Sequence, residues 1–345
     1  MPETARSRPT RLTAYARAST QLALLSDRAL FRMVDEAPAL GSGIGGTSVA
    51  LEIDGVGVFA KKVPLTELEL RPENLRSTAN LFGLPGFYQY GLGSAGFGAW
   101  RELAAHIMSS NWVLGNEHPA FPLLYHWRVL SGSPAGAGVF AEFGDLDRSV
   151  AHWGDSSAVR TRLEALRDST ASLVLFLEYV PQNLGTWLSN RDPSALERVD
   201  RQLADTVAFM RERGLVHFDA HFHNILTDGR RLYFSDFGLA LSSRFELSAD
   251  EAAFLSEHWD YDANYTATHL INHHVAERVR GDQDRRQFVR DWAEGKRPDA
   301  VPAALASLLT RYAGTAVVTD DFHRRLLAEI RQVPERVRPT GTQTP

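Results

Sequence analysis

The chain has 345 residues, of which 44% are apolar and 23% charged, a composition typical of a globular protein long enough for one large domain or two lobes. Its formal net charge of −5 offers no positive field for nucleic acid, and no apolar run approaches the roughly 18 residues of a membrane span, so we expect neither partner. The absence of cysteine excludes disulfides, zinc–thiolate sites and thiol catalysis, and is consistent with a cytoplasmic location.

Both ends of the chain look poorly structured. Residues 1–19 carry several arginines but no apolar stretch of signal-peptide length, which predicts a disordered basic arm. Apolar residues at helical spacing over residues 20–34 then predict one amphipathic helix. At the other end, residues 334–345 are rich in proline and threonine, and we expect a disordered tail there.

A glycine-rich stretch precedes the first predicted hairpin. The pattern Gly41-x-Gly43-x-x-Gly46 is followed by two β-branched runs joined by Asp-Gly at residues 54–55, a strong hairpin signal. The second strand ends in two lysines. Glycines let the backbone approach phosphate groups and present its amides to them, so the stretch fits a phosphate-covering loop. Taken alone, it fits a flexible surface loop equally well.

Residues 64–99 read as an insertion rich in glycine and aromatic residues. They contain Gly91-x-Gly93-x-x-Gly96, which has the form of a dinucleotide-binding fingerprint. The apolar run before it is short, however, no repeated βαβ pattern follows, and no acidic residue is well placed about 20 positions further on. A glycine-rich loop that closes over a cleft is therefore the favoured interpretation.

The middle of the chain alternates helical and strand signals. Apolar spacing predicts a helix from residue 99 that carries Glu102, and residues 131–172 read as a long connection. A buried strand over residues 172–180 follows, and a long helix spans residues 193–213, with Gly214 at its C-terminal cap.

Two motifs then follow in close succession. The first is His217-x-Asp219-x-x-x-x-Asn224, and the second, Asp-Phe-Gly, begins twelve residues after Asn224 at Asp236. This order resembles the catalytic loop and metal-binding aspartate of the protein-kinase-like superfamily, which includes protein kinases and aminoglycoside/choline-type small-molecule kinases. The resemblance implies an α+β, two-lobed protein-kinase-like fold. Residues 20–180 would form a small antiparallel-sheet lobe, and residues 181–333 a larger, mainly helical lobe.

The resemblance also implies catalytic and metal-binding roles. Asp219 would take or orient the proton of an acceptor hydroxyl, and His217 would brace the loop. Asn224 and Asp236 would hold Mg²⁺ (or Mn²⁺) on the phosphates of ATP, the co-substrate. His221 could donate a hydrogen bond to the transferring phosphate.

The nucleotide would be held by the first lobe. The glycine loop would cover the phosphates, and the strand that ends in two lysines resembles the kinase pattern Val-Ala-x-Lys-Lys-Ile, which favours Lys61 over Lys62 as their partner. Glu102, with Glu73 as the alternative, would form an ion pair with this lysine. Adenine would meet backbone groups at Glu178 and Val180.

Two departures bear on regulation and on the acceptor. Phe218 stands where many regulated protein kinases have arginine, so we expect activity without phosphorylation of an activation loop. His221, where protein kinases usually have lysine, is more similar to the small-molecule kinases, whereas Asp-Phe-Gly is more similar to the protein kinases. The first interpretation is a Ser/Thr protein-kinase-like enzyme, the second a kinase for a small hydroxylated acceptor, and the third a nucleotide-binding pseudokinase.

A histidine cluster lies outside these motifs. His269, His273 and His274 follow Asp260 and Asp262, and residues four apart share one face of a helix. A metal site is one interpretation. An exposed or acceptor-binding helix is the interpretation we favour.

Overall fold

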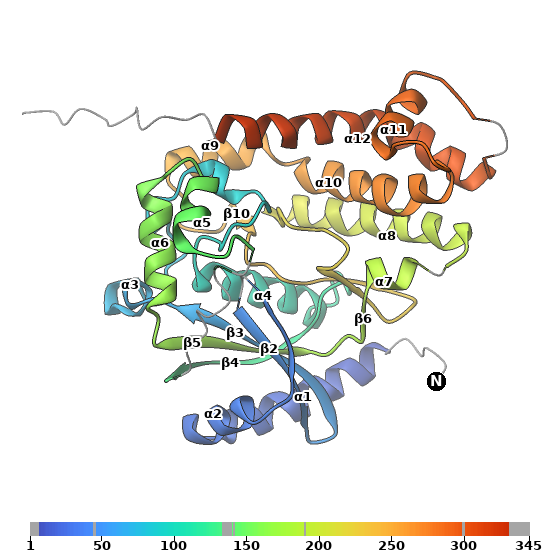
Figure 1. Ribbon diagram of the computed structural model, residues 1–345. Coiled ribbons are helices and arrows are strands. Elements are labelled where there is room, and N and C mark those ends of the chain that lie inside the picture. Colours follow the sequence, from blue (N-terminus) through green and yellow to red (C-terminus); the bar gives the residue numbers. More distant parts are fainter. Residues whose placement is uncertain are drawn as a thin grey trace, which may run out of the picture.

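The computed structural model describes residues 7–43, 46–132, 140, 142–189, 191–298 and 301–330. The protein is of the α+β class, as the sequence predicts: a five-stranded antiparallel sheet lies in the lower half of Figure 1 and most helices lie above it. The strand order is β1-β2-β3-β5-β4. All eight residues of β5 are buried, as expected for a strand inside the sheet. The strands are β1 Ala39–Gly43, β2 Gly46–Ile53, β3 Val56–Leu65, β4 Leu124–Ser131 and β5 Ala171–Glu178.

Two helices precede the sheet and pack against its lower face in Figure 1, α1 Arg8–Leu24 and α2 Asp27–Asp35. Ser7 caps α1 by accepting a hydrogen bond from the Thr10 amide, and Ser26 caps α2 in the same way. The predicted disordered arm is therefore wrong from Arg8 onward. The single helix predicted over residues 20–34 is also wrong, because Leu25 has an extended backbone and separates the two helices.

A buried ion pair attaches α1 to the sheet. The Arg11 guanidinium donates to the Glu178 carboxylate from Nη2 at 2.7 Å and from Nε at 3.0 Å, and also donates to the carbonyl oxygens of Pro119 and Phe121. The two charged side chains are only 2% and 1% exposed. Helix α1 is thus part of the folded core.

We expect Arg11→Met to lower the free energy of unfolding by about 3–5 kcal/mol, because it leaves the Glu178 carboxylate buried and uncompensated. Arg17→Met is the matched control, since Arg17 lies on the same helix but its ion pair with Asp54 is half exposed. This control should change stability little. Urea unfolding of the two variants is the measurement, and equal losses would contradict a structural role for the buried pair.

The segment between β3 and the next long helix has little regular structure. It contains α3 Glu67–Leu70 and two short 3₁₀ helices, Pro72–Asn74 and Gly86–Gln89. The Gly91–Gly96 pattern follows a 3₁₀ helix rather than a strand, and the main sheet is antiparallel. The parallel βαβ unit that a dinucleotide fingerprint requires is absent from this described segment.

Three helices lie between this segment and β5. Helix α4 Ala99–Leu114 covers the side of the sheet opposite α1 and α2 (Figure 1). The connection predicted over residues 131–172 contains α5 Leu146–His152 and α6 Ser157–Arg167, which the sequence analysis missed. Leu163 of α6 and Trp153, which follows α5, pack with Tyr88 in a separate apolar cluster.

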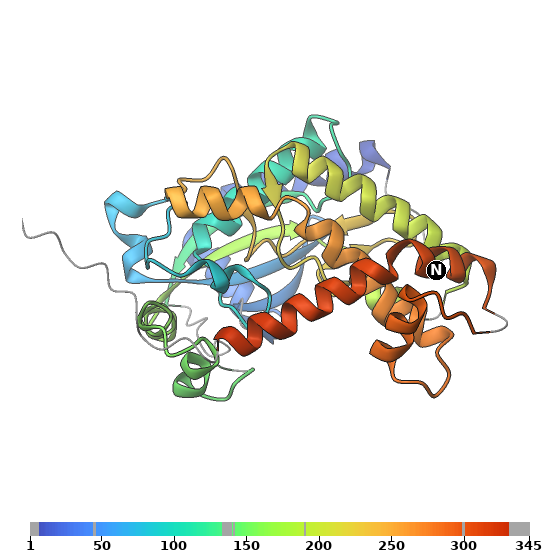
Figure 2. The ribbon, with the colours of Figure 1, turned by 90° about the horizontal axis from the view of Figure 1, so that it is seen from above.

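The upper half is mainly helical (Figures 1 and 2). The long helix predicted over residues 193–213 is confirmed as α8, and Gly214 follows it with a φ of +75°, the left-handed conformation of a helix C-cap. Two small sheets, β6-β8-β9 and β7-β10, present the loops that follow α8. The helices are α7 Leu184–Leu188, α8 Pro193–Glu212, α9 Ala249–Glu257, α10 Tyr261–Leu270, α11 Arg285–Ala293 and α12 Ala303–Ile330, with a π-helical turn at Ile271–Val275 and a 3₁₀ turn at Ala276–Arg278. The short strands are β6 Gln182–Asn183, β7 Leu215–Val216, β8 Ile225–Thr227, β9 Leu232–Phe234 and β10 Leu241–Ser242.

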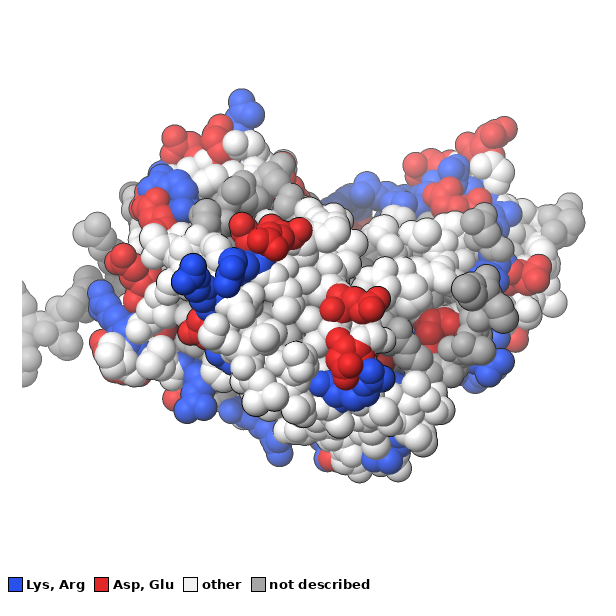
Figure 3. Space-filling model, turned by 90° about the horizontal axis from the view of Figure 1, so that it is seen from below, with Lys and Arg blue, Asp and Glu red and all other residues white. Residues whose placement is uncertain are grey.

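The surface features bear on the expected partners. On the face in Figure 3, described basic side chains stand beside acidic ones and leave a broad uncharged area between them. Within the described ranges, no helix is both long and apolar enough to cross a membrane.

Candidate functional site

Lys61 lies at the centre of a buried charge cluster. Its Nζ donates hydrogen bonds to Glu102 Oε1 and to Asp236 Oδ1, both at 2.7 Å. Burial opposes the lysine charge, but attraction from Asp236 and Glu102 outweighs it and raises the pKa of Lys61. The same attraction overcomes burial at Asp236 and lowers the pKa of that carboxyl to about 2, although its side chain remains 41% exposed. The structure thus brings together three predicted site residues from β3, α4 and the Asp-Phe-Gly motif.

The two alternative residues from the sequence, Lys62 and Glu73, are not part of this cluster. Lys62 follows Lys61 on β3, where successive side chains alternate between the two faces of a sheet, and it is half-buried. Glu73 is exposed on the 3₁₀ helix Pro72–Asn74. Burial raises the pKa of Glu102 to about 7, against the effect of Lys61. Of the two lysines and the two glutamates that the sequence left open, the structure joins Lys61 with Glu102.

Substitution by methionine should separate the two lysines. We expect Lys61→Met to weaken nucleotide binding by about 10- to 100-fold, the effect of losing a charge-assisted hydrogen bond to a phosphate. Lys62→Met should leave the dissociation constant nearly unchanged. Equilibrium binding of a fluorescent ATP analogue measures both, and equal mild effects would show that β3 does not face the phosphates.

The loop between β7 and β8 is anchored by Asp262 of α10. Its buried carboxylate accepts hydrogen bonds from the backbone amides of His217 at 2.7 Å and of Phe218 at 3.0 Å. Phe218 has a φ of +62°, a conformation that a bulky residue adopts only where its surroundings enforce it. Asp262 had been considered as part of a metal site, but its role in the structure is to fix this loop.

His217 braces the same loop, as the resemblance implied. Its Nε2 donates to the Ser235 carbonyl oxygen at 2.9 Å, and its Nδ1 accepts from the Asp219 amide at 3.3 Å. These partners assign the proton to Nε2, and burial lowers the pKa of His217 to about 4, so the ring is neutral. The Phe237 ring lies between His217 and His106 of α4, with ring centroids 4.9 and 5.0 Å away. Phe237 therefore packs α4 against the loop.

Asp219 and Asn224 face each other within the loop. Asn224 Nδ2 donates to the Asp219 carbonyl oxygen at 3.0 Å and to its carboxylate Oδ2 at 2.9 Å. No described residue donates to Asn224 Oδ1, which leaves that oxygen for another partner. Burial, together with the charge of Asp236, raises the pKa of Asp219 to about 8. A carboxyl with such a pKa suits proton transfer near neutral pH.

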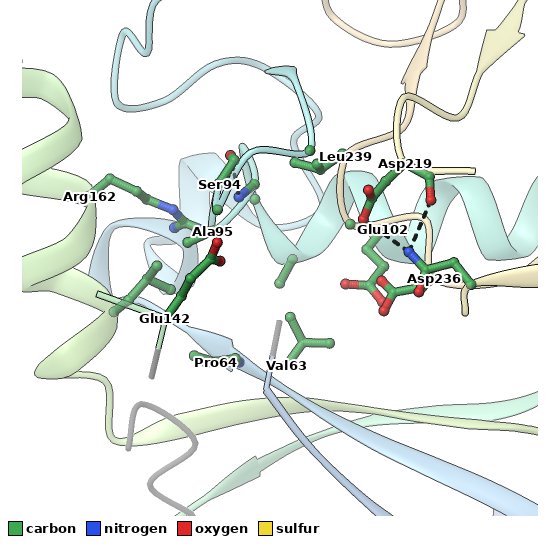
Figure 4. Close-up of a pocket in the computed structure, with 18 of the residues that line it drawn as sticks. Val63, Pro64, Ser94, Ala95, Glu102, Glu142, Arg162, Asp219, Asp236 and Leu239 are labelled. Carbon is green, nitrogen blue, oxygen red and sulfur yellow. Dashed lines mark hydrogen bonds between the residues drawn. The ribbon is translucent and has the colours of Figure 1, made fainter. Parts of the chain in front are cut away.

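A cavity of about 380 Å³ opens beside these carboxylates. Figure 4 shows Asp219, Asp236 and Glu102 on one side, with Arg162, Glu142 and Ser94 on the other. Its remaining lining residues include Val63, Pro64, Gly91, Gly93, Ala95, Gly96, Gly98, Ala99, Leu166, His221, Asn224, Gly238 and Leu239.

The predicted loop closing over a cleft corresponds to residues 91–96, which form one wall of this cavity. A Cβ built on Gly91 would lie 2.3 Å from Asp219 Oδ1, and one on Gly96 would lie 2.5 Å from the Gly238 carbonyl oxygen. Gln89 Nε2 donates to the Leu239 carbonyl oxygen and holds the segment beside the Asp-Phe-Gly motif. We call residues 86–98 the strap.

The glycine-rich hairpin lies elsewhere. Gly41 and Gly43 belong to β1 and Gly46 begins β2, while residues 44–45 between them lie outside the described residues. Gly46 has a φ of +119°, and a Cβ there would lie 2.0 Å from the Lys62 carbonyl oxygen, so this position requires glycine. These three glycines do not line the cavity of Figure 4.

The predicted adenine-binding residues end β5 and begin the next segment. The Glu178 amide donates to the Leu123 carbonyl oxygen at 2.8 Å, and its side chain pairs with Arg11. Val180 is half-buried. Neither residue lines the cavity of Figure 4, which lies at the Asp219 end of the site.

The histidines next to the loop pack around an aromatic ring. His221 lines the cavity, with Nε2 3.7 Å from Asp219 Oδ1, and burial lowers its pKa. His274 stacks on Phe222 and His269 packs against it at a tilt, with ring centroids 5.1 and 4.5 Å away. In the part of the chain that the structure describes, no group of three or more potential ligands could hold a metal ion. The metal-site interpretation of these histidines is therefore wrong.

Asn224 and Asp236 are the residues of this site that could hold a magnesium ion. Mg²⁺ commonly binds one or two protein oxygens and completes its coordination with phosphates and water, so it needs no cluster of three protein ligands. Asn224 Oδ1 and the second carboxylate oxygen of Asp236 are oxygens of this kind.

Sequence reasoning missed several residues of the site, including Arg162, Glu69 and His106.

Compared with protein-family models, the sequence matches none, and no curated protein is similar enough to it to count as a match. The chemistry of the site is therefore inferred from its own residues.

Proposed function

We propose that this protein is an ATP-dependent phosphotransferase with a two-lobed, protein-kinase-like fold. The observation that carries the proposal is the buried Lys61, which is bound to both Glu102 and Asp236. These two carboxylates line the same cavity as the paired Asp219 and Asn224. A lysine held by two carboxylates is a fixed positive charge beside a metal-binding residue, which is what a transferring phosphoryl group requires. The sheet with α4 would form the small lobe, and the segment from β6 onward the large one.

The proposed chemical step gives a role to several of these side chains. The acceptor oxygen forms a bond to the γ-phosphorus of ATP while the bond between that phosphorus and the β,γ-bridging oxygen breaks, which releases ADP. The acceptor hydroxyl proton passes to Asp219 Oδ1 or Oδ2, and from there to solvent. Lys61 binds phosphate oxygens and Asn224 holds Asp219 in place. Bound Mg²⁺, when present, would neutralise phosphate charge.

The strap favours a small acceptor over a protein side chain. Its backbone at Gly91 lies against the Asp219 carboxylate, where a folded or extended protein substrate would have to approach. A nucleotide-binding pseudokinase is disfavoured because Lys61, Glu102, Asp219, Asn224 and Asp236 are all in place. ATP as co-substrate fits the cytoplasmic location expected from the sequence.

Transfer of label from γ-labelled ATP tests the proposal. The purified chain is incubated with Mg²⁺ and, in separate reactions, with proteins and with the small-molecule fraction of a cell extract. Label on a small molecule supports the favoured acceptor class, and label on protein supports the alternative. Nucleotide binding without transfer to either fraction would support the pseudokinase.

We expect activity to be independent of phosphorylation. Phe218 is fully buried, and its ring packs against Phe254 of α9 and Tyr90 of the strap, with centroids 5.7 and 6.3 Å away. The Tyr90 hydroxyl also donates to His258 Nε2 at 2.6 Å, because His258 Nδ1 donates to the Phe254 carbonyl oxygen. These contacts hold the segment after Asp-Phe-Gly without a phosphate-binding arginine. Phosphatase treatment should leave the transfer rate unchanged, whereas a fall that traces to phosphoserine within residues 239–260 would contradict this.

A further inference from the structure

Arg162 differs from the other deeply buried arginines in how few hydrogen bonds it makes. Arg11 donates to Glu178 and to two carbonyl oxygens. Arg101 donates to Glu251 and to the Thr78 carbonyl oxygen, although its buried Nη1 has no partner within the described residues. Within the described residues, Arg162 makes one hydrogen bond, from Nη1 to Glu69 Oε2 at 2.9 Å. Its side chain is 2% exposed, and its buried Nε has no partner. A buried donor left without a partner destabilises a folded protein, so this arrangement calls for an explanation.

The ion pair with Glu69 does not supply that explanation. Glu69 accepts hydrogen bonds from the Thr66 amide and hydroxyl and from the Ala99 amide, and it thereby caps α3 and the start of α4. Arg162 balances the negative charge of Glu69 and uses one N–H group to do so, whereas a guanidinium carries five N–H groups. Within the described residues no other hydrogen bond from Arg162 is present, which leaves N–H groups available to a bound molecule.

The guanidinium lines the cavity of Figure 4 at the end away from Asp219 and Asp236, where it extends toward Glu142 and Ala95. Glu142 lines the same end of the cavity, but within the described residues the only ion pair of Arg162 is the one with Glu69. A buried arginine with free donors at the edge of a cavity is suited to bind a carboxylate or a phosphate.

The volume of the cavity limits the size of an acceptor that can contact both Arg162 and Asp219. Its volume of about 380 Å³ is near the lower limit for small-molecule sites, and the γ-phosphoryl group would take part of it. The strap closes the side next to Asp219 through Gly91 and Gly96. An acceptor of a few carbon atoms would fit between the two ends.

We propose that the acceptor is a small hydroxylated molecule that carries an oxyanion, either a carboxylate or a phosphate, which Arg162 binds while the hydroxyl meets Asp219. This inference rests on the proposed phosphotransfer function and specifies its substrate. The hydroxyl oxygen receives the phosphoryl group as described above, and the oxyanion takes no part in bond making or breaking.

The first test asks which molecules accept label. The small-molecule fraction of cells that make the protein is passed over a strong anion exchanger at neutral pH, and each part is incubated with the full chain, Mg²⁺ and γ-labelled ATP. The acceptor should be retained by the exchanger. Phosphatase treatment of the fraction beforehand distinguishes the two sources, since it removes a phosphate acceptor and spares a carboxylate. Acceptor activity in the unretained part, or label on proteins alone, would overturn the proposal.

The second test asks whether Arg162 is responsible. We expect Arg162→Met to raise the acceptor concentration needed for half-maximal rate about tenfold or more, as loss of a charged hydrogen bond predicts, and to leave the KM for ATP unchanged. Arg160→Met, on the exposed side of the same helix, is the control and should alter neither value. Because Arg162→Met leaves Glu69 unpaired, the double variant with Glu69→Gln is measured as well, and thermal unfolding reports whether each variant folds.

The outcomes separate this inference from the proposed function. If Arg162→Met raised the KM for ATP and left the KM for the acceptor unchanged, Arg162 would bind the nucleotide. If neither KM changed, the role of Arg162 would be structural. Either result overturns the inference. If no fraction accepts label and the chain does not bind Mg–ATP, the phosphotransferase proposal itself fails.

Discussion

Replacing Asp219 by asparagine is expected to reduce phosphotransfer by on the order of 10²-fold or more while Mg–ATP affinity stays nearly intact. Asn224 Nδ2 contacts Asp219 Oδ2, and an asparagine oxygen can accept the same hydrogen bond, so the loop should keep its shape. What the variant loses is the proton acceptor. Because the pKa of Asp219 is raised to about 8 by burial and by Asp236, the wild-type rate should fall as the pH drops through that range and the base becomes protonated. The variant should lack this acidic limb.

Single-turnover transfer from labelled ATP measures the loss of phosphotransfer. Equilibrium nucleotide binding measures whether the affinity for Mg–ATP is kept. Asp205→Asn, on the exposed side of α8, is the control and should retain full activity. Near-normal turnover in Asp219→Asn would show that Asp219 is not the base. Loss of nucleotide binding would instead place this carboxylate at the phosphates or the metal.

The features of the fold that could be predicted from sequence are those with local signals. The Asp-Gly hairpin signal placed Lys61 on a strand, helical spacing placed Glu102 on a helix, and a glycine after a long apolar repeat marked the end of α8. The ion pair between Lys61 and Glu102 was expected from the resemblance, and the structure provides its geometry. Each of these expectations depends on residues that are close in sequence or on one short motif.

The features that could not be predicted depend on distant partners. Arg11 lies in a stretch whose composition suggests a solvated arm, but its partner Glu178 is 167 positions away. One signal was available: Ser7 followed by Pro9 is typical of a helix start. Arg162 likewise pairs with Glu69 across 93 positions. It lies in a connection whose glycine, serine and charged residues gave no clear signal for the two helices α5 and α6.

The position of the strap was also beyond sequence reasoning. The glycines of residues 91–96 predicted a loop that could close over a cleft, but not which side chain it would meet. Gly91 lies against Asp219, and the neighbouring Tyr90 packs among aromatic residues of four other segments, including Phe218 and Phe322. Packing of this kind leaves no periodic pattern in the sequence. In our proposal, however, the resulting position of the strap is the reason to favour a small acceptor over a protein substrate.

Asp236→Asn is expected to weaken nucleotide binding and to raise the Mg²⁺ concentration that half-maximal binding requires. The aspartate provides an oxygen that is open to a metal while its other oxygen binds Lys61, and an amide is a weaker ligand for a hard cation. A second effect follows from charge: because Asp236 contributes to the raised pKa of Asp219, its neutralisation should lower that pKa and move the acidic limb of the remaining activity to lower pH.

Glu102→Gln separates metal binding from the positioning of Lys61. Both variants remove one carboxylate partner of Lys61, and both contacts measure 2.7 Å in the native structure. Glu102 is buried and lines the cavity beside Asp236, but it is assigned no contact with metal, so its variant should weaken ATP binding without changing the Mg²⁺ requirement. If titration of Mg²⁺ gave the same midpoint for Asp236→Asn and Glu102→Gln, Asp236 would be a partner of Lys61 alone. The metal would then have to bind elsewhere, and the assignment of Asn224 as its second ligand would fail as well.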